Sequence, residues 1–149
     1  MSLLDPPAET PKKHYILRIT IGAVVLVVII ASWFTFRYYP EKKAADQFFA
    51  ALASGDTAKA YALWKPSATY TMSDFLADWG TNGYYGPVHS YRIMDAKAVR
   101  NSVSIEVNVA ISPYAQMPEP GDGEKSVKTK VVTIWVTPAD KSLSFPVPY

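Results

Sequence analysis

One uninterrupted apolar stretch constrains the fold of this chain more than any other feature. Residues 19–36 read ITIGAVVLVVIIASWFTF and carry no charge. About 20 helical residues, each rising about 1.5 Å, cross a hydrocarbon core roughly 30 Å thick, and Arg18 at the N-terminal end can extend to the headgroups. We therefore predict a transmembrane helix over residues 15–39, preceded by a disordered, Pro-rich tail over residues 1–14.

A cleaved signal peptide is the alternative interpretation of an apolar N-terminal segment. The apolar region of a signal peptide is usually roughly 7 to 15 residues long, and a small-x-small site follows it. The stretch in this chain is longer, and no such site precedes a polar segment. Aromatic residues at both ends are typical of the membrane interface, and a retained anchor is favoured. They are Tyr15 on one side and Trp33, Phe34, Phe36, Tyr38 and Tyr39 on the other.

The orientation of the anchor depends on the Lys and Arg residues beside it, and these are balanced. Three lie before the apolar stretch and three after it: Lys12, Lys13, Arg18, Arg37, Lys42 and Lys43. We expect a short cytoplasmic tail and an exported domain, because an uncleaved signal would precede the whole folded mass in this way.

The residues beyond position 40 are electrically neutral, with eleven Lys and Arg against eleven Asp and Glu. A neutral domain without a basic block offers no footprint for phosphate backbones, so we predict no nucleic-acid partner. The chain has no cysteine. Disulfides, thiolate metal sites and a thiol nucleophile are therefore excluded.

Three amphipathic helices are predicted after the anchor. Pro40 fits either the first turn of a helix or a kink, and EKKAADQFFAALASGD follows it with apolar residues spaced i, i+3, i+4, i+7. Gly55 suits the C-terminal cap of this helix, and Asp56 suits the N-terminal cap of the next, TAKAYALW. The third helix is expected in MSDFLADWG, where Thr71 and Asp74 have capping-box spacing.

Beyond Pro87 the apolar period changes from helical to two, which is typical of strands. Residues 103–111 alternate between apolar and polar side chains, and residues 88–99 and 126–137 are predicted as further strands. Residues 138–141 should form a turn into a fourth strand, SLSFPVPY. The fold class predicted is α+β, with two or three helices packed on a curved antiparallel sheet of about four strands.

The run AADQFFAALASGDTAKAYALWKPSATYTMSDFLADWG resembles the opening of nuclear-transport-factor-2-like domains. In that family a helix ending in a small-Gly-Asp turn leads into a second helix with an Ala-Tyr-aliphatic stretch. The resemblance implies that residues 41–149 form such a domain, in which a bent sheet wraps long helices into a cone with a pocket. It implies fold more than activity, because one scaffold carries many functions.

Bacterial members of this family often follow one membrane anchor, as in the VirB8-like inner-membrane components of secretion systems. The resemblance thus implies a single-pass protein of the bacterial inner (cytoplasmic) membrane, with its C-terminal domain in the periplasm or another extracytoplasmic space. No catalytic motif of the family matches residue by residue.

The sequence offers little chemistry for catalysis. In a pocket enzyme, a carboxylate base and a proton-donating Tyr or acid would have to converge in the pocket. Asp78 is the candidate for a carboxylate that faces the pocket. We favour a solvated or helix-end position for Asp78. The chain has two distant histidines and no HExxH spacing or Gly-rich phosphate loop. We therefore predict no metal, no cofactor and no enzymatic activity.

Aromatic residues crowd into residues 61–91, and most of them are needed for the core. Tyr84 and Tyr85 lie in a glycine-flanked turn, where simple packing and a protein interface are both open interpretations. Tyr114 lies in the Pro/Gly-rich segment 112–124, which is either a solvated hairpin tip or a contact loop.

Small residues in the predicted anchor leave room for another membrane helix to approach, although no GxxxG pair is present. The candidate interface residues of the anchor are Gly22, Ala23, Ala31, Ser32 and Trp33. Our leading hypothesis is a membrane-anchored accessory or scaffolding subunit, with membrane lipids and other integral membrane proteins as partners. The alternatives are a tethered pocket for a small ligand or lipid and, third, a pocket enzyme.

Overall fold

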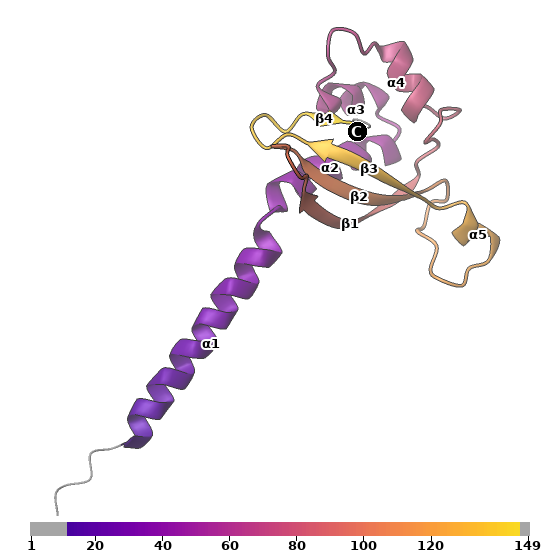
Figure 1. The fold of residues 1–149 in the computed structure, drawn as a ribbon. Helices are drawn as coiled ribbons and strands as arrows, with labels where there is room; N and C mark the ends of the chain where they lie inside the picture. Colours follow the sequence, from indigo (N-terminus) through magenta and orange to yellow (C-terminus); the bar gives the residue numbers. More distant parts are fainter. Residues whose placement is uncertain (1–11, 147–149) are drawn as a thin grey trace, which may run out of the picture. The chain divides into compact units, whose positions relative to one another are not determined.

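The computed structural model describes residues 12–146 and divides the chain into two compact units, Met1–Arg37 and Tyr38–Tyr149 (Figure 1). Helix α1 (Lys12–Phe36) belongs to the first unit. The second unit is an α+β domain, as predicted. Its elements are α2 (Tyr39–Ala53), α3 (Thr57–Trp64), α4 (Met72–Trp79), β1 (Ser90–Ala98), β2 (Ile105–Ser112), α5 (Glu124–Val127), β3 (Lys130–Val136) and β4 (Leu143–Ser144).

Helix α1 is long and apolar enough to cross a membrane. All of its described side chains from Tyr15 to Phe36 are exposed. The hydroxyl of Thr20 donates to the carbonyl oxygen of Ile16 at 2.9 Å, which satisfies this polar group within the helix, as hydrocarbon surroundings require. Residues 1–11 of the tail that we predict to be disordered lie outside the described residues, and α1 begins at Lys12.

The helices of the domain begin and end at the capping residues that the sequence predicts. Pro40 lies in the first turn of α2. At the other end of α2, Gly55 has a φ of +77°, and the amides of Gly55 and Asp56 donate to Leu52 and Ala51 at 3.0 and 2.9 Å. This is a Schellman motif. The carboxylate of Asp56 then caps α3 by accepting from the amide of Lys59 at 3.0 Å.

Helix α4 opens with the predicted capping box. The hydroxyl of Thr71 accepts from the amide of Asp74, and the carboxylate of Asp74 accepts from the amide of Thr71 at 2.8 Å. Gly80 follows as the C-terminal cap, and its amide donates to the carbonyl of Leu76 at 2.9 Å.

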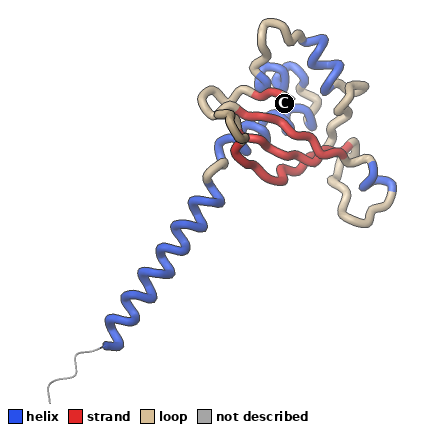
Figure 2. Tube along the Cα trace, in the orientation of Figure 1, coloured by secondary structure: helices blue, strands red, loops and turns tan. Residues whose placement is uncertain are grey.

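The four strands form one antiparallel sheet in the order β1-β2-β3-β4. Helix α2 packs on one face of this sheet and α3 packs against α2 (Figures 1 and 2). Alternate side chains of the two central strands are buried on the helix face: Ile105, Val107, Val109, Ile111, Val132, Ile134 and Val136. The other face carries polar side chains together with Val131 and Trp135. On this face Lys97 pairs with Glu106 at 3.0 Å and Thr133 donates to Asn108 at 2.7 Å.

Aromatic rings from α2, α3 and α4 meet in the core between the helices and the sheet. The ring of Phe48 lies 5.0 to 5.2 Å from the rings of Phe49, Trp64 and Trp79, measured between centroids. Phe145 stacks on Trp79 at 5.7 Å with an interplanar angle of 7°. These rings form part of the buried core of the domain.

The first strand prediction that differs concerns Val103, which the alternating pattern places on the buried face. Its side chain is 80% exposed, and β2 begins only at Ile105. The amide of Ser104 donates to the hydroxyl of Ser102 at 3.1 Å. The side chain of Ser102 thus stabilises a turn that continues to the residue before β2. The predicted strand is therefore two residues too long at its start.

The predicted strand over residues 126–137 is correct only from Lys130 onward. Ser126 and Val127 belong instead to α5, and Lys128, the C-terminal cap of this helix, pairs with Glu124 at 3.2 Å, one helical turn away. The predicted fourth strand is also shorter than expected, since β4 contains only Leu143 and Ser144. Residues 147–149 of that prediction lie outside the described residues.

Candidate interaction surface

The turn that follows α4 holds Tyr84 and Tyr85 in different environments. Their amides donate to the carbonyls of Ala77 and Asp78 at 2.9 and 2.8 Å, which ties the turn to the helix. Gly83 is needed here, because a Cβ atom at this position would lie 2.7 Å from the carbonyl oxygen of Asp78. The ring of Tyr85 stacks on the core ring of Trp79 at 4.8 Å, whereas Tyr84 is 74% exposed.

A lysine side chain lies beside each of two tyrosines at the same end of the sheet, the exposed Tyr84 and the half-buried Tyr114. The ammonium group of Lys130, at the start of β3, donates to the carbonyl of Tyr84 at 2.9 Å and lies 5.7 Å from the centroid of its ring. The ammonium group of Lys125 lies 5.9 Å from the ring of Tyr114. Such contacts contribute about 0.5 to 1 kcal/mol at exposed sites, so they orient these rings more than they stabilise the fold.

A cleft of about 370 Å³ opens beside Lys130. Its lining combines apolar side chains with two lysines and, among the described residues, includes no carboxylate: Tyr85, Gly86, Pro87, Ile111, Ser112, Pro113, Val127, Lys128 and Lys130. Val127 is 82% exposed. The hydrogen bond to Glu124 first, and Tyr114 second, raise the pKa of Lys128.

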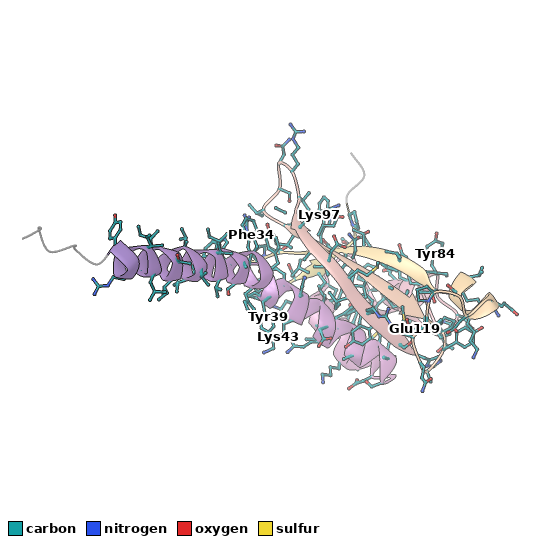
Figure 3. The ribbon with its side chains drawn as sticks, turned by 90° about the horizontal axis from the view of Figure 1, so that it is seen from below. Phe34, Tyr39, Lys43, Tyr84, Lys97 and Glu119 are labelled. Atoms are coloured by element: carbon teal, nitrogen blue, oxygen red, sulfur yellow. The ribbon has the colours of Figure 1, made fainter. Side chains whose placement is uncertain are left out.

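We name this region the distal surface and define it as Tyr84, Tyr114, Lys125, Val127, Lys128 and Lys130. It lies beyond the end of the sheet where β2 finishes and β3 begins, together with α5 (Figures 2 and 3). The opposite end of the sheet contacts the start of α2, where Lys141 donates to the carboxylate of Glu41 at 2.6 Å. The eight residues of β2 separate the two ends by about 25 Å.

The other predicted interface residues lie on α1 and do not share one face. Gly22 and Ala31 are nine positions apart, which is about two and a half helical turns. The two residues therefore lie on opposite sides of α1. The same holds for Ala23 and Ser32. Ala23 lines a shallow hollow of about 270 Å³ along α1, and Trp33 is 68% exposed at the other end of the helix.

The carboxylate considered for catalysis, Asp78, and two other carboxylates of the domain are engaged in structural contacts. Asp78 accepts a hydrogen bond of 2.6 Å from the hydroxyl of Tyr70, and burial followed by this bond raises the pKa of Tyr70. Asp74 belongs to the capping box, and Asp46 accepts from Tyr91 at 2.7 Å. Among the described residues, no three His, Cys, Asp or Glu side chains form a group that could hold a metal ion.

Four residues of the distal surface, Lys125, Val127, Lys128 and Lys130, do not appear among the interface predictions from sequence. Val127, Lys128 and Lys130 fall inside the segment that the β-branched composition assigns to one strand. Glu124 and Lys128, one helical turn apart directly after Gly123, are the signal that could have indicated a helical turn there.

Comparison of the chain with protein-family models, with curated proteins and with solved structures finds no match.

Proposed function

We propose that this protein is a membrane-anchored accessory or scaffolding subunit that binds a partner protein through its distal surface. One observation carries the proposal: Tyr84 and Tyr114, from two separate loops, lie with the 82% exposed Val127 at one end of the domain. Tyr84 is exposed and Tyr114 is half-buried, and tyrosine side chains are enriched among the anchors of protein interfaces. The role of α1 is then to hold this surface beside a membrane complex.

The exposed apolar side chains of α1 support the membrane-anchoring part of the proposal. Exposures of 47% for Ile30 to 70% for Tyr15 leave a large apolar area for lipid or for other membrane helices to cover. We place the anchor in the bacterial inner membrane with the domain on the extracytoplasmic side. A protease-protection assay on sealed vesicles tests this orientation, and digestion of the domain from the cytoplasmic side would contradict it.

We also propose that the domain is related to the nuclear-transport-factor-2-like fold. The order of helices before antiparallel strands and the Schellman turn at Gly55-Asp56 support this relationship. The aromatic side chains between helices and sheet belong to the buried core, and we therefore favour a partner-binding role over a small-ligand pocket.

Copurification in mild detergent tests the proposed function. The tagged full chain is expected to copurify with a larger membrane complex in a fixed stoichiometry, and the double variant Tyr84→Ala/Val127→Ser is expected to lose most of that complex. Lys97→Gln is the matched control, since Lys97 is 61% exposed at the other end of the sheet. A monomer that retains only lipid, or equal recovery with both variants, would contradict the proposal.

A further inference from the structure

The lining of the cleft of the distal surface has two parts: apolar residues, which we call the floor, and the lysines Lys128 and Lys130, which we call the rim. The cleft volume of about 370 Å³ lies in the lower range of small-molecule sites, which suits one or two side chains of a partner and not a folded domain. Ile111, Pro87 and Pro113 supply apolar atoms, and Tyr85 presents part of its ring. An apolar side chain is therefore the group that this floor would bury favourably.

The cations on the rim are available to an incoming anion. Lys128 pairs with Glu124 on the surface, where the two side chains are 54% and 83% exposed, and such pairs exchange partners at little cost. Lys130 donates one hydrogen bond to the carbonyl of Tyr84, and an ammonium group has three donors. Both lysines can thus donate to a carboxylate without breaking the fold.

We propose that this cleft binds an acidic segment of a partner protein that carries an aromatic or aliphatic side chain next to a carboxylate. This inference rests on the proposed function and names the chemistry of the partner. The complementarity is local, because the domain as a whole is neutral while the cleft lining contains two lysines and no carboxylate among the described residues. A phosphate backbone would need a longer basic track than these two residues provide.

Fluorescence anisotropy with the full chain in phosphatidylcholine nanodiscs tests the proposal. The probe is a fluorescein-labelled hexapeptide that alternates Glu with Phe and Leu, and its comparison is the same peptide with Gln in place of Glu. The acidic peptide should bind at least about tenfold more tightly than the Gln peptide, because its carboxylates pair with the rim.

Variants place the binding in the cleft. Lys128→Gln/Lys130→Gln should weaken the acidic peptide about tenfold, and Val127→Ser should weaken both peptides, whereas Lys97→Gln should bind like the wild type. Lys128 and Lys130 are exposed, so these variants are expected to fold, and circular dichroism checks this.

Three results would overturn the proposal. They are equal affinity for the two peptides, wild-type affinity in the double lysine variant, and cleft-dependent binding of phosphatidylglycerol vesicles in place of the peptide. If the peptide fails to bind while copurification still depends on Tyr84 and Val127, the peptide chemistry is wrong and the proposed function stands.

Discussion

The carboxylate of Glu41 is almost completely buried, with its side chain 7% exposed, and Lys141 is the cation that compensates it. Lys141→Met would leave a buried charge without a partner. We expect a loss of about 2 kcal/mol in the free energy of unfolding, below the roughly 3 to 5 kcal/mol of fully buried pairs, because the Lys141 side chain is 37% exposed. Urea denaturation in detergent measures this loss.

A double-mutant cycle isolates the interaction between these two residues. Lys141→Met should cost less in the background of Glu41→Gln, since an amide tolerates the lost cation better than a carboxylate. Additive effects of the two substitutions would mean that the ion pair contributes nothing to the attachment of the β3–β4 turn to α2.

The hydroxyl of Tyr91 reports on the contact between β1 and α2. Burial first, and the hydrogen bond to Asp46 second, raise the pKa of Tyr91 from 10.0 to about 12. A raised pKa means that the stabilisation is present below pH 10 and is lost as the pH rises through about 12. Tyr91→Phe should cost about 1 kcal/mol at neutral pH and should flatten this alkaline loss, as measured by urea denaturation from pH 8 to 12. Parallel curves for the two proteins would refute this prediction.

At the scale of elements, helix α4 depends on its capping box. Thr71→Ala should cost about 1 kcal/mol, because the substitution removes the side-chain acceptor for the amide of Asp74 and a donor to its carboxylate. Ser73→Ala in the same helix is the control, since Ser73 is exposed and should change stability little. Equal effects of the two substitutions would exclude a role for the cap.

The same capping box predicts that the stability of the domain falls at acidic pH. The hydrogen bonds from Thr71, first through its hydroxyl and then through its amide, lower the pKa of Asp74 below 3.8. A depressed pKa means that this stabilisation is present above pH 3.8 and is lost as the pH falls through the folded-state value. Asp74→Asn should therefore reduce the difference in Tm between pH 7 and pH 3. An unchanged difference would assign the acid sensitivity to other carboxylates.

Elements with local signals are predicted well from the sequence, and elements decided by distant contacts are not. The caps at Gly55, Asp56 and Thr71 are correct because each depends on residues a few positions away. Val103 has the right composition for a strand, but the turn before it determines where pairing starts. Phe145 reaches the core from outside any strand, by stacking on Trp79, and no pattern in its neighbours encodes that contact.

At the scale of the whole molecule, the distal surface depends on the register of the sheet. Ile111 pairs with Lys130, which brings the end of β2 and the start of β3 beside the turn that carries Tyr84. The sequence identifies Tyr84 and Tyr114 as separate candidates, but only the folded sheet brings them to one end. Tyr85 shows the limit of the same reasoning, because its neighbour in sequence is exposed while its own ring packs on the core.

The two units of the chain should separate without loss of the domain. Every residue of the buried hydrophobic core belongs to the second unit, from Ala45 to Leu143, whereas the exposed apolar side chains of α1 all belong to the first. We expect the full chain to remain in the membrane fraction after carbonate extraction. A fragment of residues 38–149 should be water-soluble and should unfold cooperatively, with a Tm close to that of the intact chain in detergent. A soluble full chain would contradict membrane anchoring, and a fragment that aggregates or lacks a cooperative transition would mean that α1 helps to hold the domain together.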